Sequence, residues 1–116
     1  MDNIDSHTKS DEYAEQLAIQ LRKGFLAFCV LRVCTDEAKY TSDIIGQLRN
    51  ADLIVVEGTI YPLLSRLQKD GLLQRDWKES EQGPPRKYYE TTEFGKLVAK
   101  SMHQKIETLH KTLEKL

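Results

Sequence analysis

The chain has 116 residues, of which 40% are hydrophobic and 30% charged, and this length and composition suit one domain with a single core. The net charge of −1 gives no overall electrostatic attraction to nucleic acid, so a DNA-binding surface would have to be local. The longest apolar run, residues 25–31, is far shorter than the roughly 20 residues that span a bilayer. We therefore expect a soluble cytoplasmic protein without membrane contact.

The first third of the chain predicts a flexible arm followed by a helix. Residues 1–12 are polar and lack periodicity, which is typical of an arm. From Tyr13 the pattern becomes helical, and residues 25–34 are apolar nearly all round, so the second half of this helix is expected in the core. Cys29 and Cys34 lie in that half and are predicted to be buried thiols. The apolar face consists of Ala14, Leu17, Leu21, Phe25 and Phe28.

A short second helix is predicted after a connection over residues 35–40. Thr41 or Ser42 can cap it, because a side-chain oxygen at this position accepts a hydrogen bond from the first free amides of a helix. Residues 50–56 form a connector with room for a short strand. The apolar positions of this helix are Ile44, Ile45 and Leu48.

A third helix follows, and it contains a proline. Its pattern ends at Gly71, a typical helix terminator. Proline lacks an N–H and is tolerated best in the first helical turn, so Pro62 predicts a start near Gly58 or Thr59, with Thr59 as the cap. The inward positions are Ile60, Leu63, Leu64 and Leu67.

The opposite flank of the third helix is polar. A solvated face is the plain interpretation, but the following segment favours another. Residues 72–78 and 86–91 alternate as strands, with a turn-rich link over residues 80–85, and Trp77 is expected to be a packing residue. The outward flank consists of Thr59, Tyr61, Pro62, Ser65, Arg66 and Lys69.

Three helices followed by a β-hairpin are the order of a winged helix-turn-helix, here over residues 13–91. The predicted fold class is mainly α with a small β-hairpin (α+β). In this fold the third helix enters the major groove and the hairpin, or wing, reaches an adjacent backbone. Basic and acidic residues are equal in number between residues 57 and 91, however, so charge alone does not favour DNA.

Residues 92–116 predict a last helix with a narrow apolar seam. The spacing alternates between three and four, as in a coiled coil, and predicts either a dimer interface or packing on the chain's own first helix. A dimer would present two recognition helices about 34 Å apart and would need a palindromic site. The seam consists of Ala99, Met102, Ile106, Leu109, Leu113 and Leu116.

Two motifs, EGTIYPLLSRLQKDGLL and GPPRKYYETTEFG, closely resemble the PadR family of bacterial winged helix-turn-helix regulators, in its short form with one helix after the wing. LRKGFLAFCVLRVC and YTSDIIGQL are similar to the family's first two helices, so the resemblance covers residues 21–97. It implies a dimeric transcriptional repressor, and some members of the smaller subfamily bind flat aromatic drugs or phenolic compounds at the dimer interface. The DNA contacts it implies are Thr59, Tyr61, Pro62, Ser65 and Arg66 on the third helix, Arg86, Lys87 and Tyr88 on the wing, and Lys23 on the first helix.

The chain departs from the family pattern at three positions. GPPRK lacks a cation that usually precedes this segment of the wing, and Thr91 stands where an apolar residue is common. Ile106 occupies the neighbourhood of an aromatic residue that stacks on the ligand in drug-binding relatives. Met102, His103 or His110 can instead line an interface pocket.

The predicted function is therefore a homodimeric repressor of transcription, bound to a double-stranded DNA operator and released by a small-molecule effector. The alternative is a winged-helix module that binds protein, since a fold does not fix a function. Control by oxidation of Cys34 is a third possibility. An enzyme is not expected, because His7, His103 and His110 have no nucleophile or ligand partner in a motif, and no cofactor or metal is predicted.

Overall fold

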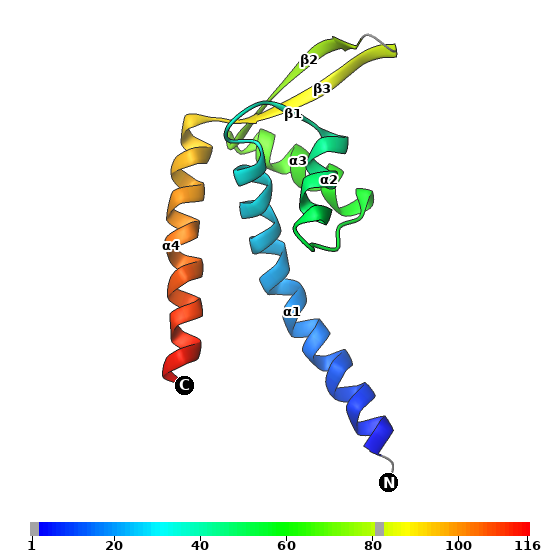
Figure 1. Cartoon of the computed structure of the whole chain (residues 1–116), viewed down its shortest axis with the longest axis vertical. Coiled ribbons are helices and arrows are strands. Elements are labelled where there is room, and N and C mark those ends of the chain that lie inside the picture. The colour runs from blue at the N-terminus through cyan, green and yellow to red at the C-terminus, as the bar shows by residue number, and fades with distance from the viewer. Residues whose placement is uncertain (1–2, 81–82) are drawn as a thin grey trace.

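The computed structural model describes residues 3–80 and 83–116 and consists of four helices and a three-stranded antiparallel sheet (Figure 1). The predicted α+β fold class is confirmed. The elements are α1 (Asn3–Val33), β1 (Lys39–Tyr40), α2 (Thr41–Asn50), α3 (Glu57–Lys69), β2 (Leu73–Ser80), β3 (Gly83–Thr91) and α4 (Glu93–Lys115). The sheet order is β1-β3-β2, and its hairpin projects from one end of the molecule while α1 and α4 extend from the other.

One core joins all four helices to the base of the sheet. The C-terminal half of α1 contributes Val30 and Leu31, and Cys34 follows directly after it, which confirms the prediction that this part of the chain is buried. The inward faces of α2 and α3 pack against it as their spacing predicts. The other buried members include Ile44, Ile45, Leu48, Val55, Ile60, Leu63, Leu64, Leu67, Leu73, Tyr89 and Ala99.

The first half of α1 contradicts the predicted arm. Residues 3–12 are helical, and side chains 6–17 are exposed. Their sequence contains no proline or glycine, and it includes Lys9, Glu12 and Glu15, which favour helix. The polar composition of residues 3–12 therefore reflects a helix that is exposed to solvent, and it does not indicate that the helix is absent. The apolar face is buried only from Phe28, since Leu17 and Leu21 are 63% and 70% exposed.

α2 begins one residue earlier than a Thr41 cap would place it. Tyr40 is the N-cap, and the Asp43 carboxylate accepts the Tyr40 N–H at 3.4 Å, so the acid three residues into the helix satisfies this amide. Tyr40 also ends β1, a two-residue strand that pairs with β3 and that the sequence did not predict. The connector after α2 contains no strand over residues 51–56, so the short strand for which the sequence has room does not form.

α3 begins at Glu57, so the predicted Thr59 cap is wrong. Val56 is the N-cap, and the Ile60 N–H donates to its carbonyl at 3.1 Å. Pro62 lies in the second turn, where its missing amide leaves the Gly58 carbonyl without the usual donor.

The end of α3 is as predicted. Gly71 has a φ of 81°, which a residue with a side chain rarely adopts. The Leu72 N–H returns to the Leu67 carbonyl at 2.9 Å and the Gly71 N–H to the Gln68 carbonyl at 3.1 Å, which closes the helix with two of its last carbonyls satisfied.

The hairpin strands are longer than predicted. β3 includes Pro84 and Pro85, which the sequence had assigned to the turn. The register shifts between Lys78 and Ser80, and proline is tolerated at such a bulge because it removes only a hydrogen bond that the bulge already breaks. The predicted link over residues 80–85 lies partly outside the described residues.

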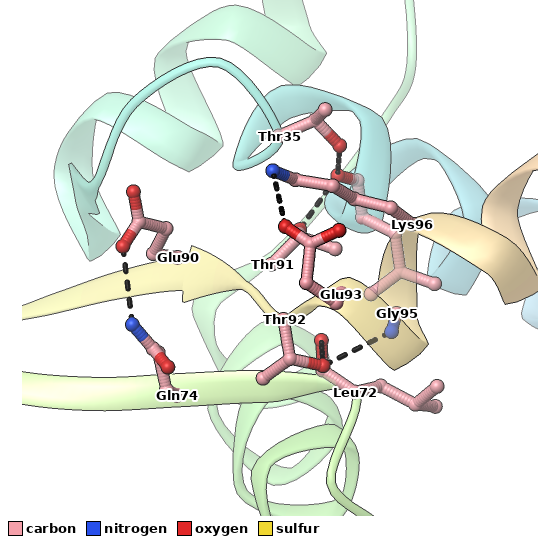
Figure 2. A network of polar contacts seen from close by, with 10 residues as sticks. Thr35, Leu72, Gln74, Glu90, Thr91, Thr92, Glu93, Gly95 and Lys96 are labelled. Carbon is pink, nitrogen blue, oxygen red and sulfur yellow. Dashed lines mark hydrogen bonds and ion pairs between the residues drawn. The ribbon is translucent and has the colours of Figure 1, made fainter.

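A polar junction fixes the sheet to α4 (Figure 2). Thr91 is buried, and its hydroxyl donates to the Leu31 carbonyl at 2.7 Å. The polar side chain at this position, where the family commonly has an apolar residue, thus has a hydrogen-bond partner on α1. Thr92 caps α4 by accepting the Gly95 N–H at 3.0 Å. A Cβ on Gly95 would collide with the Leu72 carbonyl oxygen, so only glycine fits there.

Candidate DNA-binding interface

The predicted outward flank of α3 is brought together on one exposed face. Ile60, Leu63, Leu64 and Leu67 turn inward, so every predicted contact residue of this helix faces solvent. The side chains of Thr59, Ser65, Arg66 and Lys69 make no hydrogen bond or ion pair with any other described residue, and Tyr61 is 52% exposed. These groups are free to bind an external partner, and the N-terminal end of α3 carries positive dipole charge.

Exposed apolar residues precede this flank and were missed from the sequence. Ile54 is 97% and Val56 56% exposed, in the connector that leads into α3. A run of apolar residues without helical or strand period, such as LIVV, is the signal that could have identified them.

The wing residues are held by neighbouring side chains, which the sequence did not predict. Nη2 of Arg86 donates to Ser42 Oγ at 3.1 Å, and its guanidinium carbon lies 4.1 Å from the centroid of the Tyr40 ring. The rings of Tyr40 and Tyr88 are 3.9 Å apart. A hydrogen bond with Tyr40 raises the pKa of the Tyr88 phenol above its ordinary value. The start of α2 thus supports the predicted contact residues of β3.

The other face of the wing carries a second cation on an aromatic ring. Nζ of Lys87 lies 5.2 Å from the centroid of Trp77. Trp77 is 58% exposed, so the prediction that it is a packing residue is wrong. Strand alternation correctly predicts that Trp77 is on the same face of β2 as Leu73. The core covers this face only at its base, where Leu73 lies.

Lys23 lies on the exposed part of α1, and its ammonium makes no hydrogen bond or ion pair with another described residue.

The predicted seam of α4 divides into two parts. Ala99 is buried, and Met102 and Ile106 are partly buried against the core, so this part packs within the chain. Leu109, Leu113 and Leu116 are 61%, 69% and 97% exposed. α1 and α4 diverge toward their free ends, which leaves the second part of the seam uncovered in the single chain (Figure 1).

A groove of about 640 Å³ lies between α1 and α4. His103 lies in its wall, with Nδ1 3.4 Å from Arg32 Nη1 and Nε2 2.8 Å from Glu107 Oε1. The neutral tautomer with hydrogen on Nε2 satisfies both partners, since Nδ1 then accepts from Arg32. Of the candidate pocket residues, His103 lines this groove. The remaining lining residues are Thr35, Lys96, Ala99, Lys100 and Gln104.

The prediction of two buried thiols is confirmed for Cys34 and only in part for Cys29. Cys34 is fully buried, and burial raises its pKa to about 12, so it is held as an unreactive thiol. Cys29 is half-buried, and burial also raises its pKa. Control by oxidation at Cys34 is therefore not supported. No group of three potential metal ligands occurs in the described part of the chain, and no helix there is long and apolar enough to cross a membrane.

Three packed helices followed by a hairpin that is bound to the second helix define a winged helix-turn-helix protein. The chain belongs to the PadR-like transcriptional regulator family, whose model matches residues 30–101. It is a transcriptional regulator of that family.

Solved structures of the same fold agree. A PadR-like transcription factor from Bacteroides fragilis is 45% identical, with 85% of this chain and 96% of that chain covered and a TM-score of 0.74. A PadR family regulator from Eggerthella lenta is 28% identical, with 93% and 95% covered and a TM-score of 0.80. A PadR-like regulator from Bacillus cereus is 33% identical, with 83% and 94% covered and a TM-score of 0.72.

Proposed function

We propose that the protein is a homodimeric transcriptional repressor that binds a palindromic operator through α3 and the wing. The observation that carries this proposal is the outward flank of α3, whose polar side chains are exposed and have no partner among the described residues. Hydrogen-bonding groups left free on a helix that projects its N-terminus suit the major groove of DNA. Bound there, the protein blocks transcription by occupying the operator.

The residues divide by the type of contact that their chemistry allows. Arg66 and Tyr61 are proposed to contact base edges, since an arginine fork matches two acceptors on guanine. Phosphate contacts are proposed for the remaining members, which carry hydroxyls or cations. They are Thr59, Ser65 and Lys69 on α3, Arg86, Lys87 and Tyr88 on the wing, and Lys23 on α1, with Pro62 packing against the sugar-phosphate backbone. Residues 13–91 form the proposed DNA-binding domain.

The dimer is proposed to form through residues 92–116. Leu109, Leu113 and Leu116 continue the seam beyond the part that packs on α1, and they are exposed in the single chain. A second copy that covers them would bury large apolar side chains now in contact with water. A two-fold axis would then place the two α3 helices about 34 Å apart, one turn of DNA.

The proposed effector is a small molecule at the dimer interface that alters the distance between the two α3 helices. The groove between α1 and α4 supports this, because its volume of about 640 Å³ is sufficient for such a ligand and it lies beside the seam. Binding there would release the operator by changing the angle between α4 and the DNA-binding domain.

A protein-binding module is the second candidate, and the exposed Ile54 and Val56 favour it. Apolar residues before α3 could contact a partner protein rather than thymine methyl groups. The two candidates differ in salt dependence, because only DNA binding releases condensed counterions.

Fluorescence anisotropy with labelled DNA from the gene's own upstream region, beside a scrambled duplex, tests the proposal. Lys23, Lys69, Arg86 and Lys87, counted in both protomers, make about eight proposed phosphate contacts and contribute about −7 to the slope of log K against log salt. Selective binding with a slope of several units supports the repressor. Binding that is neither selective nor salt-dependent would move the assignment to the protein-binding module.

A further inference from the structure

A cluster of five side chains joins the wing to the start of α2, and we call it the tyrosine–cation cluster. Its members are Tyr40, Ser42, Lys78, Arg86 and Tyr88. Tyr40 and Tyr88 are register partners on β1 and β3, and Lys78 and Arg86 are register partners on β2 and β3. Because side chains alternate along a strand, Lys78, Arg86 and Tyr88 lie on the same face of the hairpin.

Each cation of the cluster rests on a tyrosine. The guanidinium carbon of Arg86 is 4.1 Å from the Tyr40 ring centroid, and Nζ of Lys78 is 4.5 Å from the Tyr88 ring centroid. Ser42 adds the hydrogen bond that fixes one end of the Arg86 guanidinium. These contacts orient two long side chains that would otherwise sample many rotamers.

The contacts that hold the two cations come from neutral groups. Neither Lys78 nor Arg86 forms an ion pair with a carboxylate in residues 3–80 or 83–116. Two acids on the same elements bind backbone amides instead of these cations: Asp43 accepts the Tyr40 N–H at 3.4 Å and Asp76 accepts the Trp77 N–H at 2.9 Å. Neutral groups therefore hold two adjacent positive charges in place.

We infer that Lys78 contacts the DNA backbone beside Arg86, and that Tyr40 and Ser42 are positioning residues that hold Arg86 for this contact. The inference rests on the proposed DNA-binding function. A pair of oriented cations without carboxylate partners fits the repeated phosphates of a duplex. Tyr40 and Ser42 also belong to the start of α2, so they fix the wing's cations relative to the helix-turn-helix.

Salt-titrated anisotropy of Lys78→Gln tests the contact. Loss of one phosphate contact in each protomer should make the slope of log K against log salt shallower by about 1.8. Lys111→Gln is the matched control, since it removes the same charge from an exposed site near the far end of α4. A Lys78→Gln variant with the wild-type slope would overturn the contact.

A double-mutant cycle with Ser42→Ala and Arg86→Gln tests the positioning role. Ser42 is exposed, so its replacement leaves the core intact. Arg86→Gln should cost less affinity in the Ser42→Ala background than in the wild-type protein, because the arginine is already less well held. Additive losses would overturn the role.

Wild-type protein and Arg66→Ala measured in the same series separate this inference from the proposed function. If the wild type binds DNA selectively and Arg66→Ala weakens it, while Lys78→Gln has no effect, the inference alone fails. If the wild type binds no DNA, both fail together.

Discussion

The outward flank of α3 and the wing both present basic side chains, but they hold them in opposite ways. Arg66 and Lys69 extend from α3 without a partner among the described residues, whereas Lys78, Arg86 and Lys87 each rest on an aromatic ring. A free side chain loses rotamer freedom on binding, at roughly 0.5–1.5 kcal/mol each, and an oriented one loses less. A free Arg66 can adjust to base edges that differ from site to site. Oriented cations suit phosphates, whose spacing is the same in every sequence.

The comparison also explains why counting charge along the sequence was uninformative. Acidic residues equal basic residues in number between residues 57 and 91, yet Lys78, Arg86 and Lys87 form no ion pair with a carboxylate in the described part of the chain. Asp76 accepts a backbone N–H, and Glu90 accepts from the Gln74 amide at 3.1 Å (Figure 2). A chain of nearly zero net charge can therefore present cations that no described carboxylate contacts.

The largest expected effect on operator affinity comes from separating the proposed dimer, because each protomer then binds with only one α3 flank and one wing. Leu109→Glu places two like charges in the proposed dimer interface, while Leu109 is 61% exposed in the single chain, so the protomer should stay folded. We expect a monomer by analytical ultracentrifugation and an operator affinity reduced on the order of 10²- to 10⁴-fold, because two linked binding events become one. A variant that remains dimeric would show that this part of α4 does not form the interface.

Gly95→Ala should disturb the wing's attachment rather than the α3 flank. The added Cβ would collide with the Leu72 carbonyl at the sheet–α4 junction, and we expect a loss of roughly 1–3 kcal/mol in the free energy of unfolding. Gly46→Ala is the matched control, since a Cβ there meets no atom within 4 Å and alanine favours the helix. Chemical denaturation of both variants measures the difference, and equal stabilities would contradict the described junction.

A smaller effect is expected at Tyr61. Tyr61→Ala should reduce operator affinity by roughly 1–2 kcal/mol, about 5- to 30-fold, by removing a proposed contact in the major groove. Its side chain is 52% exposed and lies off the buried stripe, so the melting temperature should change little. A fall in thermal stability like that of a core variant such as Leu64→Ala would instead identify Tyr61 as a structural residue.

Most of the helical architecture follows from apolar periodicity in the sequence. Ile60, Leu64 and Leu67 recur at helical spacing, and burial of a continuous face is the strongest determinant of such elements. The N-terminal half of α1 escaped prediction because an exposed helix needs no apolar face. The two residues of β1 carry no pattern of their own, since their conformation depends on pairing with Tyr88 and Tyr89.

The candidate site could be predicted in its composition but not in its contacts. The α3 flank followed from periodicity, because residues off the buried stripe must face outward. The role of Ser42 and Tyr40 could not be predicted, since they lie more than 40 positions before Arg86 and meet it only through β1–β3 pairing. Lys78 was overlooked because its importance depends on the register that places it opposite Arg86.

The central claim is that α3 distinguishes sequences while the wing contacts the backbone. The most direct measurement is the ratio of operator affinity to scrambled-DNA affinity for Arg66→Ala and Arg86→Ala beside the wild type, at one salt concentration. We predict that Arg66→Ala lowers this ratio by roughly 1–3 kcal/mol, whereas Arg86→Ala weakens both affinities alike and leaves the ratio unchanged. A ratio that falls with Arg86→Ala and not with Arg66→Ala would contradict it.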